Sequence, residues 1–425
     1  MKYFWMVFSL FFIILCGCAN SGIQKVEVRK TAAGYQLFRG GKPYYIKGAG
    51  ILDHYKMLSE YGGNSVRTWG ITEWDEVFSL AEKYGLTVCA GIWLEQERQG
   101  FDYSDTTATR DQFEAIKEAI LKYRDHPSLL MWGVGNELDL DYTNPGVWDA
   151  VEEVARFIHE ADGNHPTMTA TAFIEKGEVE FIQARCPHID ILCVNAYAGL
   201  PVLSRFIRDF GWQGPYILGE WGTFGHWEVA RTSWNEPIEF TSSEKAELYE
   251  NEYTAYITND PACLGAYVFL WGSKQERTAT WYSMFLPGGE KTEAIDVMHR
   301  LWKNTWPENR SPHLDSLRLN GRAASSSIIL APGSDCRAAV YALDPEGDAL
   351  RVSWEILYET TDKRTGGDEE NKPDEVDGLN IRPEGMTLRF TAPAKEGPYR
   401  LYVIVLDQKG SGAHANIPFY VKEVN

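Results

Sequence analysis

The chain has 425 residues, of which 44% are hydrophobic, and this is enough for a large core divided among two or three domains. Its formal net charge of −19 argues against nucleic acid and anionic membrane surfaces as binding partners, because these carry the same sign of charge. The 15 Trp, 22 Tyr and 19 Phe residues suit a large core and also the binding of flat apolar ligands.

The N-terminus has the pattern of an export signal. One Lys precedes an apolar stretch that is short for a membrane span, and Leu15-Cys16-Gly17-Cys18 follows it. These four residues resemble the lipobox of bacterial lipoproteins, which implies cleavage before Cys18 and lipidation of that cysteine. We therefore expect a signal peptide at 1–17, a tether at 18–30 and a lipid anchor in the bacterial cell envelope, at the outer membrane. An ordinary secretory signal is the alternative.

Residues 31–303 repeat a strand followed by a helix. The strands are nearly continuous apolar runs, which are typical of parallel strands covered by helices. Eight such pairs predict an α/β fold of the (β/α)8 TIM barrel type. A doubly wound open sheet is the alternative, but no glycine-rich phosphate loop follows the first strand. The expected strands are 43–50, 64–70, 87–94, 129–137, 167–173, 190–197, 215–222 and 263–273. The expected helices are the stretch before Gly62 and 73–86, 109–128, 147–161, 177–186, 201–212, 242–258 and 292–303.

The pattern changes after Lys303. Residues 304–313 are rich in Pro and polar residues and are typical of a linker. From there on, short alternating runs such as CRAAVYAL and YRLYVIVLD are separated by turn-rich spacers. This spacing predicts a small all-β, Ig-like or fibronectin-like sandwich over 314–425. The acidic turn Asp344–Asp348 could bind calcium, although such a turn is more often only solvated.

Two glutamates end apolar runs that are expected to be strands. Glu137 follows Asn136 at the end of the fourth strand, and Glu220 ends the seventh. Active sites of TIM barrels lie at the C-terminal ends of the strands, where these two ends face each other across the barrel mouth. Either glutamate alone could be a strand-end ion pair. Together they predict a retaining glycosidase, in which one carboxyl group is the nucleophile and the other the acid/base.

Four motifs carry a family resemblance. GNE at 135–137, GEWG at 219–222, NSVRTWG at 64–70 and NAY at 195–197 resemble those of the retaining β-glycosidases of clan A, and the resemblance covers roughly residues 35–305. The opening GKPYYIKGAG is similar to the glycoside hydrolase family 2 barrel. With an Ig-like domain and a lipidated N-terminus, the chain is most similar to the endo-β-1,3-glucanases of glycoside hydrolase family 158. No jelly-roll module precedes the barrel, so a full family 2 exo-glycosidase is not expected.

The resemblance implies a role for each matching residue. Glu137 is the expected acid/base, Glu220 the nucleophile, and Trp271 the platform beneath the cleaved sugar. Arg67 and Tyr197 are expected to hold Glu220 ionised and in place. The residues expected to bind substrate or to support the site are Asn136, Arg67, Tyr197, Trp271, Asn195, Trp221, Trp69 and Trp227.

The expected activity is endo-hydrolysis of laminarin-type β-1,3-glucan, a neutral β-linked polysaccharide, by a monomeric enzyme. No Cys/His spacing suggests zinc, and neither a metal nor a cofactor is expected. Two alternatives remain open. One is a retaining β-glycosidase that acts on another β-linked glycan, such as β-mannan. The other is a non-catalytic carbohydrate-binding lipoprotein, which the intact pair of glutamates argues against.

Overall fold

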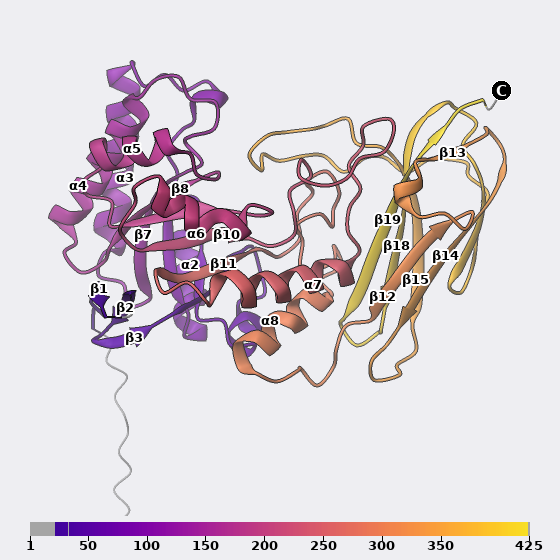
Figure 1. Cartoon of the computed structure of the whole chain (residues 1–425), viewed down its shortest axis with the longest axis horizontal. Coiled ribbons are helices and arrows are strands. Elements are labelled where there is room, and N and C mark those ends of the chain that lie inside the picture. Colours follow the sequence, from indigo (N-terminus) through magenta and orange to yellow (C-terminus); the bar gives the residue numbers. More distant parts are fainter. Residues whose placement is uncertain (1–21, 33, 424–425) are drawn as a thin grey trace, which may run out of the picture.

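The computed structural model describes residues 22–32 and 34–423, which form a closed barrel and a β-sandwich side by side (Figure 1). Cys18 and the expected signal peptide lie outside the described residues. Within the described ranges, no helix combines the length and the apolar character needed to cross a membrane.

A small antiparallel sheet precedes the barrel. It begins at Val26, so the segment expected to be a tether already contains a strand. Val26 and Leu37 pack against residues of the barrel interior, and the Val26 amide donates to the carbonyl of Asn164 just ahead of β8. The sheet therefore lies at the N-terminal end of the barrel, away from the strand ends that carry the glutamates. Its strands are β1 (Val26–Thr31), β2 (Gly34–Arg39) and β3 (Lys42–Tyr44).

The central sheet is an eight-stranded closed barrel, as the repeated strand–helix pattern predicts. All neighbouring strands are parallel, and β11 pairs with β4 to close the ring. Every residue of β5 to β11 is buried, which explains why these segments are nearly continuous apolar runs. The strands are β4 (Ile46–Ile51), β5 (Ser65–Arg67), β6 (Thr87–Ile92), β7 (Leu129–Asn136), β8 (Thr167–Thr171), β9 (Ile191–Asn195), β10 (Tyr216–Trp221) and β11 (Cys263–Trp271).

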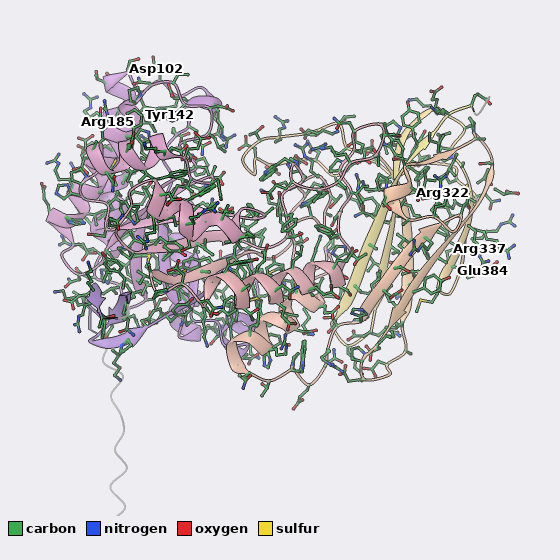
Figure 2. All side chains as sticks on the ribbon, in the orientation of Figure 1. Asp102, Tyr142, Arg185, Arg322, Arg337 and Glu384 are labelled. Atoms are coloured by element: carbon green, nitrogen blue, oxygen red, sulfur yellow. The ribbon has the colours of Figure 1, made fainter. Side chains whose placement is uncertain are left out.

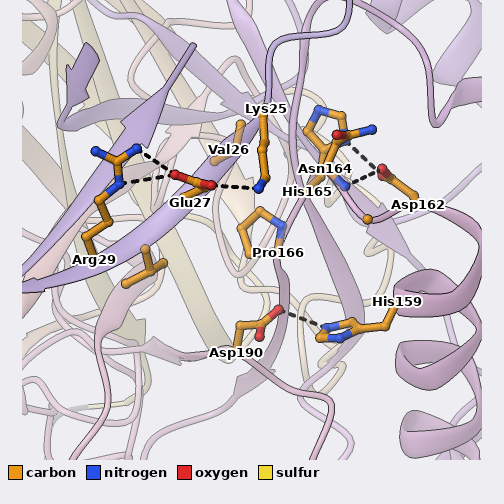
Figure 3. Close-up of a pocket in the computed structure, with 12 residues that line it drawn as sticks. Lys25, Val26, Glu27, Arg29, His159, Asp162, Asn164, His165, Pro166 and Asp190 are labelled. Atoms are coloured by element: carbon orange, nitrogen blue, oxygen red, sulfur yellow. Dashed lines mark hydrogen bonds and ion pairs between the residues drawn. The ribbon is translucent and has the colours of Figure 1, made fainter. Parts of the chain in front are cut away.

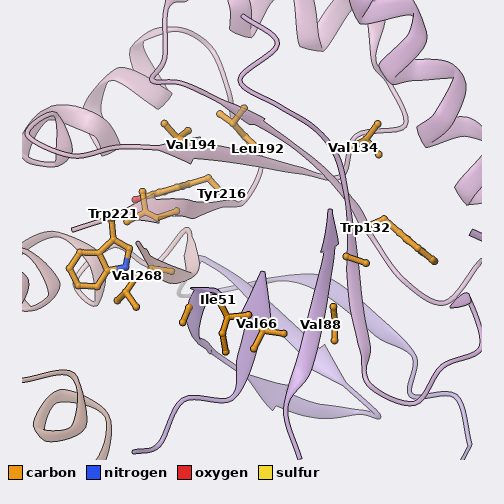
Figure 4. Close-up of a cluster of buried hydrophobic side chains, with 14 of the residues drawn as sticks. Ile51, Val66, Val88, Trp132, Val134, Leu192, Val194, Tyr216, Trp221 and Val268 are labelled. Carbon is orange, nitrogen blue, oxygen red and sulfur yellow. The ribbon is translucent and has the colours of Figure 1, made fainter. Parts of the chain in front are cut away.

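The helices cover the barrel with apolar faces. Figure 4 shows part of the core between the two layers, in which Val66, Val88 and Trp132 point away from the barrel axis. Helix α7 has a capping box at Thr241 and Glu244 and continues into a π-helical turn at Tyr253–Ile257. The helices are α1 (Tyr55–Glu60), α2 (Trp74–Tyr84), α3 (Thr106–Tyr123), α4 (Gly146–Ala161), α5 (Lys176–Arg185), α6 (Leu200–Asp209), α7 (Ser242–Glu252) and α8 (Glu293–Lys303), with short 3-10 turns at Glu97–Gln99 and Ala324–Ser326.

The C-terminal unit is a sandwich of two four-stranded sheets, ordered β12-β14-β17-β16 and β13-β19-β18-β15. It begins at His313, the last residue of the segment expected to be a linker. Figure 2 marks its outer side with Arg322, Arg337 and Glu384, and the opposite end of the molecule with Asp102, Tyr142 and Arg185. The strands are β12 (His313–Leu319), β13 (Ile328–Leu330), β14 (Asp335–Leu343), β15 (Arg351–Tyr358), β16 (Ile381–Glu384), β17 (Thr387–Thr391), β18 (Gly397–Leu406) and β19 (Gly412–Val421).

The acidic turn of the sandwich is held by cations of the protein itself. Glu346 forms an ion pair with Arg310, and Asp348 forms one with Lys409. Asp344 Oδ1 accepts from the amides of residues 346 and 348. Among residues 22–32 and 34–423, no group of three or more His, Cys, Asp or Glu side chains is arranged to hold a metal ion.

Buried polar contacts join the sandwich to the barrel domain. The amides of Leu314 and His414 donate to the hydroxyls of Ser243 and Ser242 in the first turn of α7. Arg400 of β18 donates to the carbonyl of Pro237 in the barrel domain. Since buried polar groups are costly to separate from their partners, these contacts fix the orientation of the sandwich on the barrel.

Candidate active site

The two glutamates predicted from the sequence lie at the C-terminal end of the barrel. Glu137 directly follows β7, has a backbone φ of 50°, and donates its amide to the carbonyl of Ala170 in β8. Glu220 lies within the last residues of β10. The barrel thus delivers both carboxyl groups to one mouth, from strands on different sides of the ring.

A chain of hydrogen bonds connects the two carboxyl groups. Arg67, at the end of β5, donates from Nη1 to Glu220 Oε1 at 2.8 Å and from Nη2 to Asn136 Oδ1 at 2.6 Å. Asn195, at the end of β9, donates from Nδ2 to Glu137 Oε1 at 2.8 Å and to Asn136 Oδ1 at 3.3 Å. Four strand ends therefore meet in one network, and Asn136 is its central acceptor.

Glu220 is held as an acceptor of three hydrogen bonds. Besides Arg67, the indole Nε1 of Trp69 donates to its Oε1 at 2.8 Å, and the hydroxyl of Tyr197 donates to its Oε2 at 3.0 Å. Burial alone would lower the pKa of Arg67, but the charge of Glu220, together with smaller contributions from other neighbouring groups, raises it above its usual value. The guanidinium is therefore charged and compensates the Glu220 carboxylate.

Glu137 has a different environment. Burial raises the pKa of its carboxyl group to about 7, and the neighbouring charge of Glu220 acts in the same direction. The hydrogen bond from Asn195 and the more distant charge of Arg67 oppose this shift. Two carboxyl groups with such different surroundings can act as a proton donor and an ionised base or nucleophile at the same pH.

Both carboxyl groups open into one cavity of about 560 Å³. Its walls are mainly aromatic and aliphatic, and a few polar groups converge at the floor, as in sites that bind uncharged ligands. Lys274 is the one cationic side chain that lines the cavity in the described part of the chain, and it forms an ion pair with Glu276 at 3.2 Å. The remaining lining includes Trp69, Trp93, Phe173, Trp227, Phe269 and Tyr282.

The structure brings together most of the residues predicted for the site. Asn136, Tyr197, Trp69 and Trp227 line the cavity with the two glutamates, and Trp227 is 56% exposed at its rim. Arg67 and Asn195 lie directly behind these residues and contact the glutamates as described above.

Two predicted tryptophans lie elsewhere, and Trp271 is the important correction. It does not line the cavity; instead its ring stacks on Trp302 of α8, with the ring centroids 6.0 Å apart. Tyr267 of β11 points into the barrel, and strict alternation would point Trp271 the same way. The pairing of β11 with β4, however, shifts register between Val268 and Trp271. The shift turns the side chain outward, toward the helices.

Trp221 is the second correction. It is fully buried and stacks on Tyr253 of the π-helical turn, with the ring centroids 5.7 Å apart. Glu220 before it points into the barrel mouth, so the alternation of a strand sends Trp221 outward. It supports the strand that carries Glu220 and does not line the cavity.

Sequence reasoning missed several residues of the cavity. Phe269 is the aromatic residue of β11 that lines it, and Tyr282 packs beside Phe269 with the ring centroids 5.5 Å apart. Glu276 and Lys274 come from the loop after β11. Phe269 and Trp271 both share the alternation of Tyr267, so alternation alone could not choose between them, and the loop residues carry no periodic signal.

A second cavity lies at the opposite end of the barrel. It has a volume of about 490 Å³ and is lined by the start of β1 and by residues just ahead of β8 and β9 (Figure 3). Its charged groups are paired with one another, as in Lys25–Glu27 and His159–Asp190. The N-terminal face of a TIM barrel serves stability, so this cavity is not the candidate active site.

Comparison with known proteins finds a family match over the barrel. Residues 46–304, more than half of the chain, match the model of the TIM barrel domain of glycosyl hydrolases family 2. The chain is 23% identical to mouse β-glucuronidase over 257 residues, which make up 55% of this chain and 34% of that protein. It is 25% identical to rat β-glucuronidase over 262 residues, which make up 54% of this chain and 38% of that protein. The chain thus spans little more than a third of the length of these relatives.

Solved structures share the fold. β-Glucuronidase of Bifidobacterium dentium aligns with a TM-score of 0.53 at 17% identity, covering 66% of this chain and 49% of that one. An FMN-binding β-glucuronidase from Faecalibacterium prausnitzii aligns with a TM-score of 0.54 at 14% identity, covering 94% of this chain and 59% of that one. Identities this low show the fold alone, whereas the barrel match shows the family: the chain belongs to glycosyl hydrolases family 2 through its TIM barrel domain.

Proposed function

We propose that the protein is a retaining, endo-acting β-glucanase that hydrolyses laminarin-type β-1,3-glucan by double displacement. The observation that carries the proposal is the asymmetry of two buried carboxyl groups in one aromatic cavity. Glu137 has a pKa raised to about 7, whereas Glu220 accepts hydrogen bonds from an arginine, an indole and a phenol. This arrangement supports one proton donor and one nucleophile.

In the first step, Glu220 attacks the anomeric carbon as the bond to the leaving sugar breaks. The protonated carboxyl of Glu137 gives its proton to the leaving oxygen, so a neutral alcohol departs and a glycosyl ester forms on Glu220. Arg67, Trp69 and Tyr197 orient the attacking carboxylate. Arg67 and Asn195 occupy Asn136 Oδ1 and fix the side chain beside the sugar, so its amide Nδ2 can donate to a sugar hydroxyl.

In the second step, water cleaves the ester. Burial is the larger cause of the raised pKa of Glu137 and the charge of Glu220 adds to it; once Glu220 is esterified this second contribution is gone, and the pKa falls. Glu137 then accepts a proton from the attacking water, and the bond between Glu220 and the sugar breaks. Two inversions at the same carbon restore the β configuration, and both carboxyl groups return to their starting states.

A neutral polymer is the proposed substrate class. The cavity is large enough for more than one sugar ring, and Trp69, Trp93 and Trp227 offer apolar faces for sugar stacking. Four carboxyl groups line it against one lysine, which is already paired with Glu276. An anionic sugar would meet net repulsion there. The choice of β-1,3-glucan over β-mannan rests on the sequence resemblance to glycoside hydrolase family 158.

β-Glucuronidase activity is the second candidate. It is favoured by the curated relatives, which carry that name, and by Lys274, whose ammonium group faces the cavity and could bind a uronate carboxylate. Lys274 already donates to Glu276 and to the carbonyl of Gly367, so only one of its three N–H groups would be left for a uronate carboxylate. A proton donor and a nucleophile placed as in this site serve either substrate equally well.

Release of reducing ends from a panel of glycans separates these candidates. The panel consists of laminarin, mixed-linkage glucan, cellulose, β-mannan and an aryl β-glucuronide, with the products sized by chromatography. The proposal expects the fastest release from laminarin, with oligosaccharide products of several lengths. Cleavage of mannan or of the glucuronide with laminarin left intact would contradict it, and a wild type that cleaves none of them would favour a carbohydrate-binding protein.

We also propose that Cys18 anchors the protein in the bacterial envelope. The proposal rests on the lipobox-like LCGC at residues 15–18 alone. Metabolic labelling with a palmitate analogue should mark the wild type and leave Cys18→Ser unlabelled. Equal labelling of the two proteins would contradict the proposal.

A further inference from the structure

The sandwich sends one long loop to the mouth of the barrel. The loop connects β15, which ends at Tyr358, with β16, which begins at Ile381, and it contains neither a helix nor a strand of its own. Figure 1 shows this loop crossing from the sandwich toward the barrel. Structureless connections of this length are uncommon in compact domains and are usually functional when they are ordered.

The tip of the loop is fastened to the barrel by ionic contacts. Arg98, which follows β6, donates from Nη1 to Asp368 Oδ2 at 2.9 Å and to the carbonyl of Thr365 at 3.0 Å. Gln99 donates to Asp368 Oδ1 at 2.8 Å. The Arg98 side chain is 8% exposed and that of Asp368 is 34% exposed, so this ion pair is partly shielded from solvent.

A second set of contacts fastens the loop beside β11. Lys274 donates to the carbonyl of Gly367 as well as to Glu276. The amide of Arg277 donates to Glu370 Oε2 at 2.6 Å, and Glu370 is itself 4% exposed. The loop is therefore held on two sides of the barrel mouth, by the segments after β6 and after β11.

The fastened tip lines the catalytic cavity. Thr365, Gly366, Gly367 and Asp368 are part of its wall, together with both glutamates. The two glycines have positive φ angles of 63° and 73°. A Cβ on Gly366 would lie 2.7 Å from Arg98 Nη2, and one on Gly367 would lie 3.2 Å from Lys274 Nζ. The positive φ angles favour glycine at both positions, and the missing Cβ lets the chain pass this close to the two basic side chains.

We propose that the tip of this loop, Thr365–Asp368, forms a glycan-binding subsite away from the cleaved bond, so that both domains build the substrate cleft. The inference rests on the proposed hydrolysis of a polymeric β-glycan. The exposed peptide groups and the Thr365 side chain of the tip offer hydrogen-bond partners to the hydroxyls of a neutral sugar, while Arg98 and Lys274 hold the tip in place. The sandwich thereby determines which chain lengths bind well.

Two variants loosen the tip from opposite sides. Arg98→Ala removes the charged partner of Asp368 and the donor to the Thr365 carbonyl, and it leaves every loop residue unchanged. Gly367→Val pushes a side chain toward Lys274. The matched control is Gly378→Val, because Gly378 has the same φ of 73° and no atom within 4 Å of its added Cβ. Strain in the backbone is therefore equal in the two valine variants, and only the contact with the barrel differs.

The measurement is kcat/KM along a chain-length series of β-1,3-linked glucose oligosaccharides. The inference expects Arg98→Ala and Gly367→Val to lower kcat/KM for long chains about fivefold more than for the shortest chain cleaved, mainly through KM. Gly378→Val should leave the ratio between long and short chains unchanged. Thermal unfolding of each variant verifies that it is folded, and Asp368→Asn replaces any variant that is not.

An equal loss for all chain lengths, or no loss, would show that the tip has a structural role only and would overturn the inference. Failure of the proposed substrate is a separate outcome, seen in the wild type as intact laminarin. In that case the same series is made from the polymer that the wild type does cleave. A wild type whose kcat/KM does not rise with chain length would also overturn the inference.

Discussion

Glu137 and Glu220 are the same residue type held in two environments, and this difference is the centre of the proposed mechanism. Three donors surround Glu220, whereas Glu137 has one donor, Asn195, and lies buried beside a negative charge. The sequence predicts both residues because two glutamates end apolar strands of one barrel, whereas either glutamate alone could be a strand-end ion pair. It does not predict Trp69 as a direct donor to Glu220, since that contact depends on the conformation of one side chain.

The pH dependence should follow the protonation of Glu137. Its pKa is raised to about 7, and the first step needs the protonated form, so kcat/KM should fall as the pH rises through about 7. Asn195→Ala removes a hydrogen bond that lowers this pKa, and the alkaline limb should move to higher pH. Steady-state rates across a pH series locate the alkaline limb of the wild type and of Asn195→Ala. A limb that stays in place or moves to lower pH in the variant would argue against this role for Glu137.

Neutral amides in place of the glutamates should remove activity. Glu220→Gln removes the nucleophile and Glu137→Gln the proton donor, so each should lower kcat by roughly a thousandfold or more. The matched control is Glu252→Gln, because Glu252 is also a buried carboxyl group, with a pKa raised to about 8, but it does not line the cavity. Near-wild-type kcat in either cavity variant would remove that residue from the mechanism.

At the scale of elements, the strand–helix repeat predicts the barrel well, because apolar periodicity reports burial directly. The eight expected strands all occur, as does the break between Lys303 and His313. The prediction failed at Trp271 because a register shift in β11 cannot be recognised from alternation. It also missed β1 and placed a tether there, since the polar sequence VEVRKT pairs at the edge of a small sheet and shows little apolar signal.

The corrected register makes a prediction about two aromatic residues of β11. Trp271→Ala should lower the free energy of unfolding by about 3–5 kcal/mol, because Trp271 packs between the barrel and α8. Phe269→Ala should instead lower kcat/KM of the folded enzyme most strongly, because its ring lines the cavity. Denaturant unfolding and steady-state kinetics on both variants distinguish the roles, and the reverse pattern would restore Trp271 to the site.

At the scale of the whole molecule, the two domains are joined by buried polar groups and by the Thr365–Asp368 tip. Sequence composition locates the linker and the sandwich, but contacts such as Arg98–Asp368 join residues far apart in the chain and leave no periodic trace. The same holds for Glu239 of the barrel domain, which accepts hydrogen bonds from Lys245 at 2.6 Å and from Asn416 of the sandwich at 2.5 Å.

Glu239 should make the stability of the molecule depend on pH. Burial alone would raise its pKa, but Lys245 and His414 more than offset this and lower the pKa to about 2. A carboxyl group whose folded pKa lies below its unfolded value of about 4.3 stabilises the fold above that pH, and this stabilisation is lost as the pH falls toward about 2.

Glu239→Gln should therefore lower the free energy of unfolding by roughly 3–5 kcal/mol at pH 7, because it leaves Lys245 buried without a counter-charge. The difference from the wild type should shrink as the pH approaches about 2. Glu114→Gln, which breaks a solvent-exposed pair with Lys117, is the control and should cost less than about 1 kcal/mol. Thermal unfolding across the pH range measures both, and equal effects of the two variants would contradict the prediction.

The most direct measurement of the proposed mechanism is proton NMR of the first products released from β-1,3-glucan oligosaccharides. Attack by Glu220 followed by attack of water inverts the anomeric carbon twice, so the account predicts that the β-anomer forms first and the α-anomer appears only later, by mutarotation. Initial appearance of the α-anomer would contradict it, since this would mean a single displacement by water in which Glu220 forms no covalent bond.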